Sequence, residues 1–435
     1  MRKGTSIITG LLAILIFLFR PVHAQEQKPV QPQQTPGQPE QKPAEPEEKP
    51  LAPGWLSLDC CVGPLDSAIA NGKASLERAM GINISGFFDA GYNWASSHPK
   101  DPANISLRYF DKDYNKVEFN DFNITLDKPE KDWGVGFHLA GDFGRTAELL
   151  REATFWGRTL HKEPSAELRE AFLTTTIPVG AGIGVKGGLF VSPLGTEIIP
   201  APGAYNDNIS RSFLFNLAVP LRHLGTLFSY PIYKTAPDTT VATASAGVIT
   251  GWDNPRDNNH TPSFLGGLNV SPNDKFALTS NFTIGEEPVA ASPPSARNTA
   301  RFVISNVLTF KPIEPLSTSF EYTFGHQANA SFGGTRGATW QGVAGIASYS
   351  WTDRVISALR AEWFNDRDGA RIAFAPHPNV KVAEVTLTGS YKFTKMLMGR
   401  AEVRQDWSDQ AVYKVGSSNA DRRQTTLALQ LIYTY

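Results

Sequence analysis

Cysteine, methionine and long apolar runs are all scarce in this chain. Its 435 residues include 2 cysteines and 4 methionines. Cys60 and Cys61 are adjacent, a spacing at which an ordinary disulfide between them is geometrically unfavourable, so the sequence excludes a disulfide scaffold. No further Cys or His lies near them to complete a metal site. Beyond the N-terminal leader no run of about 18 apolar residues occurs, which excludes a membrane-spanning helix.

Signatures of catalysis and of nucleic-acid binding are also missing. The motifs G-x-S-x-G, H-E-x-x-H, G-x-x-x-x-G-K-[ST] and C-x-x-C do not occur, and the 8 histidines are scattered. The net charge of -1 gives no basic surface for nucleic acid. We therefore expect no enzyme and no cofactor. Two acidic stretches lack the glycine and glutamate of an EF-hand loop, so we expect them to form turns and not cation sites. They are Asp111, Asp113 and Asn115, and Asp366 with Asp368.

The N-terminal region divides into three short segments before a long uniform one. Residues 1–24 combine a charged start, a short apolar core and "VHA" before Gln25, which predicts a cleaved secretory signal peptide. Residues 25–54 are rich in proline and glutamine, which predicts a disordered periplasmic linker that could contact the cell wall. Residues 55–80 form a lead-in segment that could include a short helix. Residues 81–435 keep one composition and one pattern of alternating polarity throughout, which predicts one domain.

Within that domain, segments of alternating polarity are separated in turn by short and long connections. Short turns rich in Pro, Gly, Asn and Asp are predicted at 128–132, 178–182, 233–238, 271–274, 311–315, 350–354 and 392–395. Long loops are predicted near 95–116, 143–165, 192–221, 254–261, 286–298, 326–337, 366–379 and 408–422. This order predicts about sixteen antiparallel strands, with about fourteen as the alternative, and both ends of the domain on the short-turn side.

The composition of the two strand faces distinguishes a soluble sandwich from a membrane barrel. In residues 395–407 one face holds Leu397, Gly399, Ala401, Val403 and Trp407, and the other holds Arg400, Glu402, Arg404 and Asp406. Residues 353–365 and 380–393 repeat the pattern. Such faces also fit a sandwich, but aromatic residues gather near strand ends, as in the interfacial girdles of barrels. Closing the sheet removes its edges, which lipid demands. We expect an all-β transmembrane barrel with apolar side chains outward.

The last thirteen residues, "RQTTLALQLIYTY", continue the alternation to the final position. Leucine or tyrosine stands at every second place from Leu427 to Tyr435, where chains commonly fray. We expect this strand to pair with residues 81–94 and close the cylinder. Its ending resembles the signal by which outer-membrane barrels are recognised for insertion, with Tyr433 and Tyr435 as the signal residues.

An ordered series of stretches resembles the beta-barrel porin-2 (OmpL-like) family of Gram-negative outer membranes. The stretches are "YFDKDYNKVEFNDFNITLDKP", "GGLFVSPLGTEII", "NISRSFLFNLAVPLRHLG", "GVITGWDNPRDNN", "EWFNDRDGAR" and "YKFTKMLMGRAEVRQDWSDQAVY". The resemblance spans most of 81–435 and is weaker around 158–168. It implies an outer-membrane barrel of porin type whose solutes are poorly defined.

Candidate site residues follow from the predicted inward face and from the longest loop. The pore-lining candidates are Lys186, Arg360, Glu362, Glu384, Lys392, Arg400, Glu402, Arg404 and Asp406. The loop 192–221 could fold inward as a constriction, and the candidates there are Glu197, Asp207, Arg211 and, just beyond it, Arg222. A transverse field between these acidic and basic groups would orient dipolar solutes. A one-residue error in strand register would reverse every assignment.

These features predict an outer-membrane porin that lets small hydrophilic solutes and ions diffuse through a water-filled lumen. The alternative is a plugged barrel that serves as a structural anchor or adhesin. A lipase-type enzyme is disfavoured, because the lipid-facing wall offers no Ser–His pair. Expected partners are outer-membrane lipid and lipopolysaccharide, the barrel assembly machinery, small solutes and ions, and further copies of the chain in a homotrimer.

Overall fold

A computed structural model describes residues 58–435, apart from 101–103, 131–133, 154–165, 237–238, 255–256, 258, 290–297, 333–335 and 373–378. The predicted signal peptide and proline-rich linker lie outside the described residues. Among the residues that are described, no helix is both long and apolar enough to cross a bilayer.

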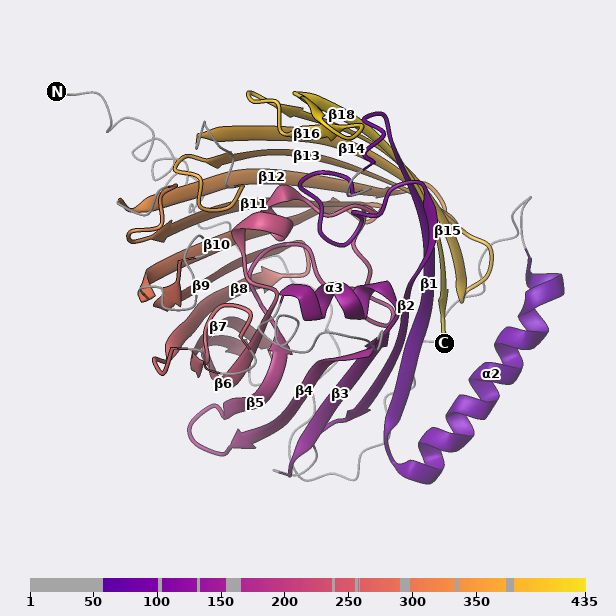
Figure 1. Cartoon of the computed structure of the whole chain (residues 1–435). Helices are drawn as coiled ribbons and strands as arrows, with labels where there is room; N and C mark the ends of the chain where they lie inside the picture. The colour runs from indigo at the N-terminus through magenta and orange to yellow at the C-terminus, as the bar shows by residue number, and fades with distance from the viewer. Residues whose placement is uncertain are drawn as a thin grey trace. The chain divides into compact units, whose positions relative to one another are not determined.

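Sixteen long strands form a closed antiparallel barrel (Figure 1). In chain order they are β1 (Asn83–Ala95), β2 (Lys116–Lys128), β3 (Gly136–Phe143), β4 (Ala166–Ile177), β5 (Ile183–Val191), β6 (Arg222–Ala236), β7 (Thr239–Ile249), β8 (Ser263–Asn273), β9 (Phe276–Pro288), β10 (Asn298–Ile313), β11 (Leu316–Gln327), β12 (Ala338–Ser350), β13 (Val355–Asp366), β14 (Val380–Lys392), β15 (Leu397–Ser408) and β18 (Arg423–Thr434). The short hairpin of β16 (Tyr413–Val415) and β17 (Asn419–Asp421) stands in the last long loop. The predicted order of short turns and long loops is confirmed.

The first and last strands close the barrel, as the sequence predicts. Phe88 of β1 stands opposite Tyr433 of β18, and the pairing continues along both strands. The chain end extends the seam, because the backbone N–H of Tyr435 donates to the Gly86 carbonyl at 3.0 Å. Its phenol reaches across β1 and donates to the carbonyl of Asn123 on β2 at 2.9 Å. The last residue therefore ties together three neighbouring strands.

Apolar side chains point out of the barrel and polar ones point in. Leu429 on β18 is 57% exposed, whereas Arg404 on the neighbouring strand is 0% exposed. Because successive side chains of a strand face opposite sides, the exposed leucines and aromatics mark the lipid-facing surface. The predicted barrel with an apolar exterior is therefore confirmed.

In the described part of the chain, helix α2 (Asp59–Met80) precedes the barrel. It ends at Gly81, whose left-handed backbone (φ 67°) lets its N–H donate to the Glu77 carbonyl. The Glu77 carboxylate accepts the N–H of Ile84 on β1 at 2.8 Å. The Asp66 carboxylate accepts the Tyr433 hydroxyl at 2.9 Å. These two bonds connect the helix to the strands that close the barrel.

Candidate pore constriction

The loop between β5 and β6, residues 192–221 and here called L3, lies inside the barrel. It includes a short π-helix, η1 (Leu214–Ala218). Near its start the N–H of Gly195 donates to Ser305 on β10 at 3.2 Å, and near its end the Ala218 carbonyl accepts the Trp340 indole of β12 at 3.1 Å. L3 therefore folds into the barrel, as the sequence predicts.

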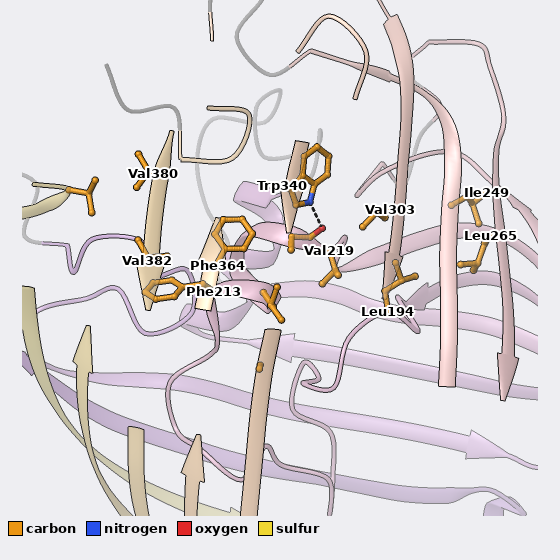
Figure 2. Close-up of a cluster of buried hydrophobic side chains, with 14 of the residues drawn as sticks. Leu194, Phe213, Val219, Ile249, Leu265, Val303, Trp340, Phe364, Val380 and Val382 are labelled. Carbon is orange, nitrogen blue, oxygen red and sulfur yellow. Dashed lines mark hydrogen bonds between the residues drawn. The ribbon is translucent and has the colours of Figure 1, made fainter. Parts of the chain in front are cut away.

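Apolar side chains of L3 pack against the inner wall (Figure 2). Leu214 and Phe213 of the loop are fully buried, in one cluster with Trp340 and Phe364 of the wall. Gly342 of β12 makes this approach possible, because a Cβ there would lie 2.8 Å from the Leu214 side chain. The loop is therefore seated on the wall by burial of apolar surface as well as by hydrogen bonds.

Two wall carboxylates hold L3 by accepting pairs of consecutive backbone N–H groups. Glu402 on β15 accepts from Ile209 at 2.6 Å and Ser210 at 3.0 Å. Glu362 on β13 accepts from Phe213 and Leu214, both at 2.6 Å. Hydrogen bonds from backbone N–H to a carboxylate are stronger than those between neutral groups, so both contacts resist hydration of the loop.

Three wall arginines contact the backbone carbonyls of the same loop. Arg360 donates to the Ser210 carbonyl at 2.6 Å, and Arg404 donates to the Arg211 carbonyl at 2.7 Å. Arg400 donates to the carbonyls of Asn206 and Asp207 at 2.8 and 2.7 Å. The wall therefore meets both the donors and the acceptors of the loop backbone with side chains of the complementary charge.

These contacts correct part of the predicted pore lining. The face is right, because the predicted wall residues of β13, β14 and β15 point inward. Seven of them are nevertheless less than 9% exposed, because L3 and its neighbours cover them, and they do not face open lumen: Arg360, Glu362, Glu384, Arg400, Glu402, Arg404 and Asp406. Four of these charges form ion pairs, with Arg360 2.6 Å from Glu384 and Arg404 2.6 Å from Asp406. Burial against a loop is not visible in strand periodicity, which reports only the face.

Two predicted wall lysines keep partial exposure. Lys186 on β5 faces inward, and its Nζ lies 4.6 Å from the ring centre of Phe172 on β4. Lys392 ends β14 on the inward side and is half-buried.

The predicted constriction residues divide into three on the loop and one outside it. Glu197 is buried and accepts from Arg360 at 2.7 Å, so it joins the wall charges. Arg211 is buried, and its guanidinium carbon lies 6.0 Å from the ring centres of both Phe110 and Phe215. Asp207 is exposed, and its backbone carbonyl accepts from Arg400.

Arg222 has a different position from the predicted one. It is the first residue of β6, and its guanidinium donates to the carbonyls of Leu168 and Leu150 and to Glu167 at 2.9 Å. These partners belong to β4 and to helix α3 (Arg145–Ala153), so Arg222 fastens the preceding loop and not L3.

The acidic stretches behave as turns and loop anchors. The Asp111 and Asp113 carboxylates are each 2.6 Å from an arginine, Arg108 and Arg145 respectively. Asp366 accepts three successive backbone N–H groups, from residues 370 to 372. Within the described part of the chain, no group of three His, Cys, Asp or Glu side chains has the geometry of a metal site.

Sequence reasoning missed the polar wall on the other side of the lumen. Ser229 on β6, Thr243 and Ser245 on β7, Asn269 on β8 and Thr279 on β9 all face inward and keep solvent exposure. Their face follows from register, because Ser229 pairs with Ser245, and Thr243, Asn269 and Thr279 form a row across three strands. We call these five residues the hydroxyl wall. The sequence signal of this wall is the two-residue spacing of Thr243 and Ser245, which a search for charged residues does not detect.

Comparisons with solved structures show the same fold. An anion-selective porin from Comamonas acidovorans matches with a TM-score of 0.54 and 11% identity, covering 81% of this chain and 99% of that chain. The outer-membrane channel DcaP of Acinetobacter baumannii matches with a TM-score of 0.52 and 14% identity, covering 81% and 97%. A loop-deleted form of the outer-membrane protein OmpT of Vibrio cholerae matches with a TM-score of 0.52 and 10% identity, covering 81% and 99%.

Sequence comparison assigns the family. No curated protein matches the chain. The pattern of one family, described as "Putative beta-barrel porin-2, OmpL-like", matches residues 81–435, which is the whole barrel domain. With the closed sixteen-stranded barrel and the inward L3, this match shows that the chain is an outer-membrane porin of the beta-barrel porin-2, OmpL-like family.

Proposed function

We propose that the protein passes small hydrophilic solutes and ions by diffusion along the side of the lumen that L3 leaves uncovered. A sixteen-stranded barrel is wide enough to hold an aqueous channel unless a loop narrows it. The observation that carries the proposal is the difference between the two inner walls. Side chains of β13 to β15 are sealed under L3, whereas the hydroxyl wall on β6 to β9 keeps its exposure.

The docked loop sets the width of the passage. L3 contacts β9, where the Asn281 amide donates to the Pro193 carbonyl at 2.6 Å. It also reaches β18, where the Tyr205 and Thr434 hydroxyls are 2.8 Å apart, and β4, where Arg169 donates to the Pro200 carbonyl. A loop fixed at both sides cannot swing freely, so we expect a passage of constant size, without catalysis.

Single-channel recording tests this function. Purified protein in planar bilayers is expected to give stepwise conductance that rises with salt concentration. Correctly folded barrels, verified by the gel shift between heated and unheated samples, that give no conductance steps would establish the plugged-barrel alternative. The apolar cluster around Phe213 is the observation that favours that alternative.

We further propose a homotrimer that associates through the outer face of β13 to β2. A shallow apolar groove crosses these strands and is lined by small residues such as Gly389, Gly399 and Ala401, with Leu431 and Tyr391 among its larger members. Small residues let neighbouring barrels approach closely in lipid. A trimer form is among the solved structures of OmpT of Vibrio cholerae, which matches with a TM-score of 0.50 and 10% identity. Ala401→Trp should yield monomers in native mass spectrometry.

We also propose that the chain is exported with a cleaved signal peptide and then inserted into the outer membrane. Residues 1–24 are expected to be removed, so mass spectrometry of the purified protein should find Gln25 at its N-terminus. Tyr433 and Tyr435 are proposed to engage the barrel assembly machinery. We expect the exposed apolar face to meet outer-membrane lipid and lipopolysaccharide, and the linker 25–54 to lie toward the cell wall.

A further inference from the structure

We propose that the passage favours uncharged, hydroxyl-bearing solutes of sugar type over ions of either sign. The inference rests on the proposed diffusion function and adds the chemical class of solute. It follows from where the structure places the charges of the lumen and from the groups that remain in contact with water.

The strongest charges of the inner wall are sequestered in pairs beneath L3. Arg360 lies between Glu384 at 2.6 Å and Glu197 at 2.7 Å, and the exposed fraction of its side chain is 0%. Arg404 is 2.6 Å from Asp406, and both side chains are 0% exposed. A close pair of opposite charges has a field that falls off much faster than that of a single charge, so these groups give little attraction or repulsion at the open side.

The carboxylates that hold the loop are also compensated. Glu402 and Glu362 each accept two backbone N–H groups of L3, and Glu402 also accepts the Thr388 hydroxyl at 2.7 Å. Both are 6% exposed or less. A solute in the passage therefore does not contact them, and their ionic hydrogen bonds are already used by the loop.

The hydroxyl wall meets water through hydroxyls and one amide. The hydroxyl wall places Ser229 beside Ser245, and the Asn269 amide donates to the Thr279 hydroxyl at 2.8 Å. Gly267 pairs with Ser245, and the Asn281 amide lies over it, because a Cβ there would collide with the Asn281 Oδ1. Hydroxyl groups both donate and accept, as sugar hydroxyls do, so each side can exchange a water hydrogen bond for an equivalent one. An ion finds no fixed countercharge on these five residues to replace its hydration shell.

The partly exposed charges at one corner are balanced among themselves. The His138 ring of β3 lies 2.6 Å from Asp127 and 3.4 Å from Glu170. The same ring stacks on Phe172 at 4.8 Å, and Lys186 approaches Phe172 at 4.6 Å. Acidic and basic groups therefore occupy adjoining positions on β2 to β5, so this corner does not select one sign of ion.

Two further charges border the uncovered space and are also of opposite sign. Asp207 on L3 is exposed, and Lys392 at the end of β14 is half-buried. Because these two charges are present, we expect a weak preference between cations and anions and not a complete lack of preference. The potassium to chloride permeability ratio should therefore lie close to unity.

Solute entry into proteoliposomes directly tests the proposed preference for uncharged, hydroxyl-bearing solutes. Glucose, gluconate and glucosamine are probes of nearly equal size that are neutral, negative and positive. We expect glucose to enter several-fold faster than either charged probe, and the two charged probes to enter at similar rates. Gluconate or glucosamine entering as fast as glucose, in vesicles whose channels conduct potassium chloride, would overturn the inference and leave the diffusion function intact. Absence of all conductance would instead reject the function itself.

A charge added to the hydroxyl wall provides the second test. Ser245→Lys should shift the reversal potential toward anions and slow glucosamine, and Ser245→Asp should do the reverse. Asn273→Lys is the matched control, because it places the same charge on the exposed turn between β8 and β9. The gel shift on heating verifies folding of each variant. If both Ser245 variants fold and keep the wild-type reversal potential, the hydroxyl wall does not border the passage, and the inference fails.

Discussion

Replacing Glu402 with glutamine tests whether the wall carboxylates fix L3 in place. The native carboxylate accepts the N–H groups of Ile209 and Ser210, and it is 6% exposed. The glutamine amide offers one acceptor oxygen, and its nitrogen can only donate, so one buried N–H loses its partner. A buried donor left unsatisfied costs about 1–3 kcal/mol. We take about 2 kcal/mol, which raises the ratio of detached to docked loop about 30-fold.

The assay is single-channel recording of Glu402→Gln beside the wild type. A loop that detaches more often should add current noise and raise the mean conductance. Glu362→Gln should have the same effect, because that carboxylate also accepts two N–H groups. Glu286→Gln, at an exposed carboxylate of β9, serves as the control. If Glu402→Gln and Glu362→Gln both keep the current noise, conductance and thermal stability of the wild type, these carboxylates do not hold L3 in place.

Three other positions give independent tests. Gly342→Ala should lower thermal stability by about 1–3 kcal/mol, because its methyl group would meet the Leu214 side chain, and calorimetry in detergent measures this loss. Gly86→Ala should slow barrel assembly by displacing the Tyr435 phenol that packs over it; insertion into lipid at wild-type rate, followed by gel shift, would contradict this role. Burial raises the pKa of Asp253 to about 6, above its ordinary value, so its ionised form costs stability above that pH. The protein should therefore be about 1 kcal/mol more stable at pH 5 than at pH 7, and Asp253→Asn should remove that difference in thermal melts.

Strand number, order and face could be predicted because each depends on local chemistry. Turn residues end the strands, and the two-residue period assigns Leu397 and Arg400 to opposite faces without knowledge of the partner strand. Closure of the sheet also follows, because an unpaired edge is not tolerated in lipid.

The environment of the inner wall could not be predicted in the same way. Arg360 and Glu362 owe their burial to a loop about 150 residues away in sequence. Nothing in the strand pattern shows which wall that loop will cover. Arg222 was misplaced for a related reason, because its partners in β4 and α3 are neighbours only in the folded barrel.

The carboxylate clamps also fix an order of events during biogenesis. Ile209 is made early, yet its acceptor Glu402 lies 193 residues later in the chain. Until β15 has been synthesised and placed, the N–H groups of Ile209 and Ser210 have no carboxylate partner. L3 can therefore complete its contacts with the wall only once β15, the second-last strand of the barrel, is in place.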